Sequence, residues 1–130
     1  MSRENVEVVR SMLEAWARGD FDAALALFDD GIVTRRAAPD PGTWHGHEGL
    51  VDVITKWVGT FDDFELTAEE FLDAGADVVV QVAQEGRGKG SGAPVKAKFW
   101  FVYTVGDGKI ARFEMHVSRS RAMEAAGLRP

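Results

Sequence analysis

Two side chains near the C-terminal end of the chain have the types and the spacing for acid–base chemistry: Glu114 and His116. They are two residues apart in a strand-like run, and alternate residues of a strand point to the same face. Burial moves the pKa of a carboxylic acid and that of an imidazole towards neutrality, where general acid–base catalysis is most efficient. The pair therefore predicts proton transfer, with His116 as the base or acid and Glu114 as its partner.

The strand itself is predicted from a long hairpin over residues 94–118, closed by Asp107 and Gly108. An Asp-Gly pair between two strand-like runs favours a type I′ turn, in which Gly106 would face Lys109. Counting outward from that turn predicts three facing pairs, which are Phe99 with His116, Phe101 with Glu114, and Tyr103 with Arg112. One face would then combine three aromatic rings with a basic, an acidic and an imidazole group.

The other face of the same hairpin is largely apolar and is unsuited to water. Its predicted members are Lys98, Trp100, Val102, Phe113, Met115 and Val117. A contiguous apolar patch on a sheet usually marks a protein interface, and a two-fold dimer is the commonest closed oligomer. We therefore expect a homodimer through Trp100, Val102, Phe113 and Met115.

Further candidates would complete a ligand pocket. Arg35, on a predicted strand, could bind a carboxylate or an enolate oxygen, or it could simply be solvated. The other candidate ligand-binding residues are Trp16, Trp57, Phe99, Phe101 and Arg112. A purely structural interpretation stays open: the aromatic rings would be core, Glu114 would pair with Arg112 or Arg35, and His116 would only hydrogen-bond Tyr103 or the backbone.

The elements that must position these residues follow from hydrophobic periodicity and turn residues. Helices are predicted at 5–18, 21–28 and 50–60, strands at 32–37, 64–73 and 77–86 before the hairpin, a loop at 38–43 and a short helical tail at 119–126. Consecutive antiparallel strands without crossover helices indicate an α+β fold. We expect a strongly curved antiparallel sheet wrapped around three helices, forming a cone with an internal pocket.

Composition narrows the function classes. The 130 residues fit a single domain, and the absence of cysteine excludes disulfides and thiolate chemistry. A net charge of −6 argues against nucleic-acid binding. No apolar run approaches the roughly 20 residues of a membrane helix, and the first residues do not resemble a signal peptide, so a cytoplasmic location is expected.

Four short motifs are spread along nearly the whole chain. They are, in order, Ala-Trp-Ala-Arg-Gly-Asp-Phe-Asp at 15–22, Gly-His-Glu-Gly at 46–49, Gly-Asp-Gly-Lys-Ile at 106–110 and Met-Glu-Ala-Ala-Gly-Leu at 123–128. With them the chain resembles the SnoaL-like branch of the nuclear-transport-factor-2-like superfamily. The resemblance implies a cone-shaped fold with a pocket between sheet and helices, and commonly a dimer. It implies cofactor-free chemistry such as isomerisation, cyclisation or dehydration, or binding without catalysis.

The residues that carry chemistry in relatives are mostly replaced here. Where the resemblance implies the aspartate base of ketosteroid isomerases, this chain has Arg35, and Phe101 stands where their second acid lies. A Tyr-x-Asp-Arg ending common in the family corresponds to His116-Val117-Ser118-Arg119. Steroid isomerisation is therefore not supported. The sequence predicts a pocket for a small, largely apolar molecule. Any proton transfer there would use His116 and Glu114, with Tyr103 or Arg35 stabilising the oxyanion. The alternative hypothesis is a non-catalytic binding or dimerisation module.

Overall fold

The computed structural model describes residues 2–37 and 41–128. Its elements are, in chain order, α1 (Ser2–Ala17), α2 (Phe21–Leu25), β1 (Phe28–Arg36), β2 (Gly42–His45), α3 (Gly46–Val58), β3 (Phe61–Ala74), β4 (Asp77–Gly88), β5 (Pro94–Gly106), β6 (Lys109–His116) and α4 (Arg119–Ala125). In the described part of the chain, no helix has both the length and the apolar character needed to cross a membrane.

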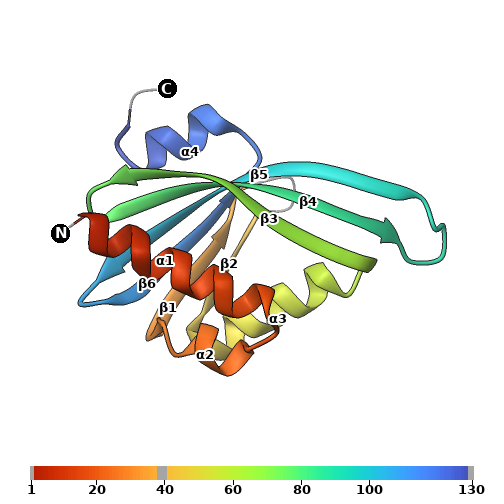
Figure 1. Ribbon diagram of the computed structural model, residues 1–130, viewed down its shortest axis with the longest axis horizontal. Helices are drawn as coiled ribbons and strands as arrows, with labels where there is room; N and C mark the ends of the chain where they lie inside the picture. Colours follow the sequence, from red (N-terminus) through yellow and green to blue (C-terminus); the bar gives the residue numbers. More distant parts are fainter. Residues whose placement is uncertain (1, 38–40, 129–130) are drawn as a thin grey trace.

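The strands form one six-stranded sheet in the order β2-β1-β6-β5-β4-β3. Neighbouring strands are antiparallel except β1 and β6, which are parallel. Figure 1 shows that the sheet is strongly curved, with α1, α2 and α3 on one side of it and α4 on the other. We call the side that faces α1–α3 the inner face and the side that faces α4 the outer face. This arrangement confirms the predicted α+β fold, a curved sheet wrapped around three helices.

Two elements differ from the sequence prediction. The segment 38–43 was expected to be a loop; residues 38–40 lie outside the described residues, whereas Gly42 and Thr43 begin β2, a short edge strand that pairs with β1. The second helix was expected to reach Phe28 but ends at Leu25, because the Leu27 carbonyl accepts a hydrogen bond from the Ile110 amide at 2.8 Å. That long-range pairing draws the chain into β1 at Phe28, four residues earlier than local periodicity indicates.

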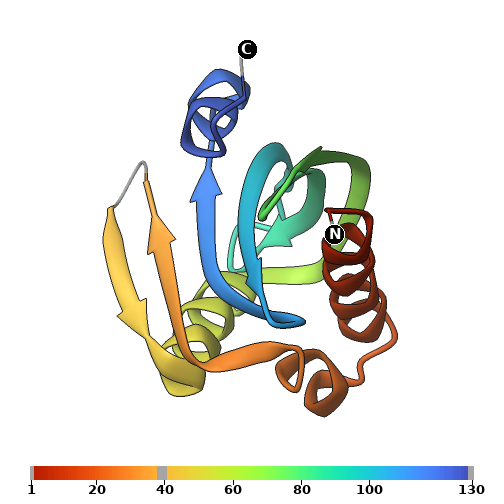
Figure 2. The ribbon, with the colours of Figure 1, turned by 90° about the vertical axis from the view of Figure 1, so that its left-hand side faces the viewer.

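The main core lies between the inner face and the helices. Its fully buried members include Val9 of α1, Ile32 of β1, Leu50 of α3 and Val80 of β4. A second, smaller cluster lies on the outer face, where Ala122 of α4 packs with Val79 and Val102. Figure 2 shows α4 standing apart from the other helices, directly after β6. The helix caps only the outer cluster, so the interior is shaped by α1, α2 and α3.

The three inner helices sit over different parts of the sheet. Helix α1 packs against α2 and β3, whereas α3 packs against β1 and β2. Helix α3 follows β2 without a linker, and Gly46 makes the sharp change of direction with a φ of +71°, a conformation that favours glycine. The α1–α2 pair and α3 are therefore held apart over the same concave sheet.

Candidate functional site

The β5–β6 hairpin decides which side chains face the interior. Its turn is as predicted: Gly106 pairs with Lys109, and Asp107 and Gly108 both have positive φ, at 52° and 74°. The register then shifts by one residue, because Val105 pairs with Ile110 but Thr104 pairs with Arg112. Ala111 is the extra residue of a β-bulge, two residues on one strand facing one on the other.

This bulge overturns the predicted facing pairs. Beyond it Trp100 pairs with His116, Phe101 with Met115, Val102 with Glu114 and Tyr103 with Phe113. Since a slip of one residue moves every side chain to the opposite face, the expectation that Arg112, Glu114 and His116 share a face with Phe99, Phe101 and Tyr103 is wrong. The three polar side chains lie on the outer face instead.

The predicted dimer patch is wrong in its composition for the same reason. Phe113 and Met115 belong to the inner core, whereas Trp100 and Val102 pack in the outer cluster beneath α4. Part of the apolar outer face is thus covered by the chain's own C-terminal helix. The homodimer itself stays a prediction.

On the outer face, the predicted acid–base residues do contact each other. The Nε2 atom of His116 lies 3.0 Å from a carboxylate oxygen of Glu114, and Arg112 forms an ion pair with the same carboxylate. The side chains of Glu114 and His116 are only 8% and 10% exposed, whereas that of Arg112 is half-exposed. The Nδ1 atom of His116 is buried without a hydrogen-bond partner. These three side chains form a largely buried ion-pair network on the outer face of the sheet.

Arg35 also lies on the outer side. It occupies the position beside Glu114 in the parallel β1–β6 ladder and is exposed. Its neighbour Arg36 has its guanidinium 5.1 Å from the centre of the Trp44 ring. Arg35 faces away from the interior, so its predicted role as an anion ligand at the pocket has no support in its position.

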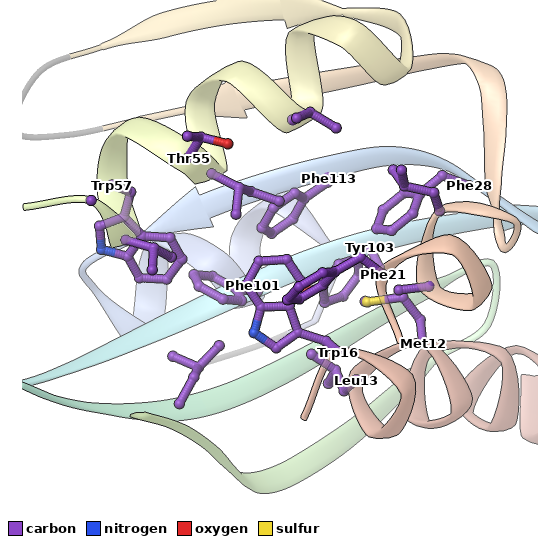
Figure 3. Close-up of a pocket in the computed structure, with 17 residues that line it drawn as sticks. Met12, Leu13, Trp16, Phe21, Phe28, Thr55, Trp57, Phe101, Tyr103 and Phe113 are labelled. Atoms are coloured by element: carbon purple, nitrogen blue, oxygen red, sulfur yellow. The ribbon is translucent and has the colours of Figure 1, made fainter. Parts of the chain in front are cut away.

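The interior holds a cavity of about 470 Å³ between the inner face and the two groups of helices. Figure 3 shows Leu13 and Trp16 of α1 on one side, Thr55 and Trp57 of α3 on the other, and aromatic rings of the sheet between them. The sheet contributes Leu66 of β3, Phe101 and Tyr103 of β5, Phe113 of β6 and Phe28 of β1. The space exists because α1 and α2 are held apart from α3.

The chemistry of the lining is almost wholly apolar. None of the described side chains that line the cavity carries a carboxylate, an imidazole, an amine or a guanidinium group. Its polar side-chain atoms are the hydroxyls of Thr55 and Tyr103 and the indole nitrogens of Trp16 and Trp57. The Trp57 nitrogen donates a hydrogen bond to the buried Gln84 side chain at 2.9 Å. This leaves few groups to orient a ligand.

Among the described residues that line the cavity, Tyr103 is the ionisable one, and it is deeply buried. Burial raises the pKa of its phenol far above the ordinary value. The phenol therefore stays protonated at any physiological pH. It can donate a hydrogen bond to a ligand but is not available as a base.

Sequence reasoning located part of this lining. Of its candidates, Trp16, Trp57, Phe101 and Tyr103 line the cavity, while Phe99 lies beside it with its ring centre 6.0 Å from that of Trp57. It missed the contributions of α2 and of the exposed side of α3, such as Phe21, Val51 and Thr55. These residues lie outside the apolar stripe of a helix, which is the signal that periodicity detects. Among the described residues, no group of three or more His, Cys, Asp or Glu side chains could hold a metal ion.

Comparison with known proteins agrees with this architecture. The sequence profile of the SnoaL-like domain matches residues 9–113. None of the curated proteins with which the chain was compared matches it. Among solved structures, an NTF2-like protein of unknown function from Burkholderia pseudomallei is similar, with 24% identity, a TM-score of 0.77, and 93% of this chain and 95% of that chain covered.

Two further structures are similar over nearly the whole chain. An NTF2-like protein from Burkholderia xenovorans has 25% identity and a TM-score of 0.74, with 97% of each chain covered. TerC, co-crystallised with polyporic acid, has 20% identity and a TM-score of 0.76, with 95% of this chain and 98% of that chain covered. The curved sheet and inner helices thus define an NTF2-like protein. The chain belongs to its SnoaL-like family.

Proposed function

We propose that this protein binds one small, uncharged, largely apolar molecule in the cavity between α1, α2, α3 and the sheet, without transforming it. The observation that carries the proposal is a cavity of about 470 Å³ in which the phenol of Tyr103, kept protonated by burial, is the one ionisable group among the described lining residues. Ligand sites are typically about 300–1,000 Å³, mostly apolar, with a few polar groups that fix orientation. TerC, a protein of the same fold, was crystallised with a small molecule, which favours a binding role for the scaffold.

The described lining residues carry no charged side chain, and this limits the ligand class. A carboxylate or ammonium group inside such a cavity would lose its hydration and gain no counter-charge, at a cost of several kcal/mol per ion. An uncharged molecule loses far less, and its apolar surface is stabilised by about 25 cal/mol for each Å² removed from water. We therefore expect the cavity to bind uncharged molecules in preference to charged ones.

The catalytic alternative has less support. Proton transfer needs a base within hydrogen-bond reach of the bound molecule or connected to it through one water. The proposed base, His116, and its partner Glu114 lie on the outer face, separated from the cavity by the thickness of the sheet. The Tyr103 or Thr55 hydroxyl could donate a hydrogen bond to an oxyanion, but the described residues of the lining include no carboxylate or imidazole to act as the base.

The test uses two fluorescent probes with the same skeleton, N-phenylnaphthylamine and its sulfonated analogue anilinonaphthalene sulfonate. We expect saturable 1:1 binding of the uncharged probe and at least tenfold weaker binding of the anionic one, a difference of about 1.4 kcal/mol. Equal binding of both probes, or no saturable binding of either, would contradict the proposal.

A variant that fills the cavity tests whether the probe binds inside the protein. Ala24 is 3% exposed and lines the cavity, so Ala24→Phe should abolish binding of the uncharged probe. Ala125→Phe is the matched control, because Ala125 is exposed on α4, on the other side of the sheet. If Ala24→Phe does not fold, as judged by circular dichroism, Leu13→Trp fills the half-buried side of the same space. Unchanged binding in a folded filled variant would move the site elsewhere.

A further inference from the structure

Exposure divides the cavity lining into a floor and a rim. The floor is formed by sheet residues such as Phe101, Tyr103 and Phe113, which are 2–3% exposed. Phe21 at the start of α2 and Val51 of α3 line the same cavity and are 54% and 43% exposed. Thr55, one helical turn after Val51, is also exposed. We call Phe21, Val51 and Thr55 the rim.

The apolar character of the rim is unusual on this surface. Among the described residues, three large hydrophobic side chains are exposed, which are Phe21, Val51 and Val117. Two of the three line the cavity, whereas Val117 follows β6 and does not. Exposed apolar side chains that gather at one place commonly mark a binding groove. Their position here at the edge of a cavity marks its opening.

Several charged side chains next in sequence to the rim residues are engaged with other groups. Asp52 and Lys56 of α3 pair with each other at 3.2 Å. Asp20 accepts a hydrogen bond from the Ala23 amide at the start of α2 and lies 4.0 Å from Arg18. The rim residues themselves offer two apolar side chains and one hydroxyl, which again fits an uncharged ligand.

Phe21 is the bulkiest member of the rim. It begins α2 directly after the turn at Gly19 and Asp20, and its ring meets the ring of Trp16 edge-on, with centroids 5.2 Å apart. Trp16 is half-buried and lines the cavity as well. A ring that is half in water and packed against a neighbouring ring can rotate without disturbing the buried floor.

We propose that the ligand reaches the cavity between α2 and α3, and that the Phe21 ring is the barrier that sets the rate of exchange. This inference rests on the proposed binding function and adds the route to that site and the residue that controls it. A barrier slows arrival as well as departure, so its removal raises the association rate constant together with the dissociation rate constant. A residue that merely contacts the ligand would change the dissociation rate alone.

The test is stopped-flow fluorescence with N-phenylnaphthylamine on the whole protein. For Phe21→Ala we expect the association rate constant to rise by about tenfold, within the range that variants of one site show, and the dissociation rate constant to rise by at least as much. Val51→Trp narrows the same opening and should lower both constants. Val117→Ala is the matched control, an exposed apolar residue off the cavity, and should change neither. Phe21→Leu repeats the test with a smaller loss of apolar surface should Phe21→Ala fold poorly.

The outcomes separate the two proposals. Unchanged rate constants in Phe21→Ala and Val51→Trp, with normal binding, would overturn the route and leave the binding function standing. A rise in the dissociation rate constant alone would make Phe21 a ligand contact and overturn its role as the barrier. Absence of saturable binding in the unaltered protein would overturn the binding function, and this inference with it.

Discussion

The rings of Tyr103 and Phe113 stack across β5 and β6, with centroids 4.8 Å apart and planes inclined by 7°. Phe101 meets the Phe113 ring edge-on at 5.1 Å. Stacked and edge-to-face arrangements are the favoured geometries of aromatic pairs, and each contributes about 0.5–1.5 kcal/mol beyond the area it buries. These three rings form the buried floor of the cavity.

The floor should be the most sensitive part of the site to truncation. We expect Phe113→Ala to lower the free energy of unfolding by about 3–5 kcal/mol, because it removes a buried ring and leaves a void. Urea denaturation measures this loss. Phe21→Ala, at the exposed rim, is the comparison and should cost much less; similar losses for both would contradict the division into floor and rim.

Because of Tyr103, we expect the free energy of unfolding to change with pH in the alkaline range. Its pKa is raised in the folded protein, so the unfolded chain loses this proton more readily, and the contribution is intact below about pH 10 and falls as the pH rises further. It is the single tyrosine of the chain, so phenolate absorbance reports on it alone. We expect no phenolate signal above pH 10 until the protein unfolds. Tyr103→Phe should flatten this part of the stability profile; ionisation of Tyr103 near pH 10 in the folded protein would refute the prediction.

The outer network should matter for stability and not for binding. Glu114→Gln weakens the buried contacts with Arg112 and His116, and we expect it to lower the free energy of unfolding by about 1–3 kcal/mol. The affinity for N-phenylnaphthylamine should stay unchanged, because the network lies across the sheet from the cavity. Urea denaturation and probe titration measure the two effects separately. A large loss of affinity at full folding would show that the outer face communicates with the site.

Gly46 fixes the start of α3 and with it one side of the rim. Its φ of +71° is unfavourable for any residue with a side chain, although the nearest atom to an added Cβ, the Asp30 carbonyl oxygen, would be at 3.6 Å. We expect Gly46→Ala to cost roughly 1–2 kcal/mol from backbone strain alone. Thermal unfolding measures it. Gly106→Ala, which has open space and no positive φ, should be nearly neutral; equal effects would argue against strain at Gly46.

The fold could be predicted because its helices and long strands carry strong periodicity and because the Asp107-Gly108 turn is a specific signal. The face of the sheet on which Glu114 and His116 lie could not be predicted, because it depends on the extra residue of the β-bulge, Ala111. A bulge has no reliable local signature, and it inverts every side chain that follows it. Strand β2 escaped prediction because four residues are too few to show alternation. The rim was missed because Phe21 and Val51 lie outside the buried stripes of their helices.

The parallel pairing of β1 with β6 has a consequence for folding kinetics. Phe28 pairs with Ile110, which lies far along the sequence, so this contact closes a long loop of the chain. The hairpins of β3, β4, β5 and β6 join neighbours in sequence and can form early, whereas closing so long a loop is slow. We expect docking of β1 on β6 to be the late, rate-limiting step. Until it occurs, the apolar inner face is open to water, so the slow folding species is the one most prone to aggregate.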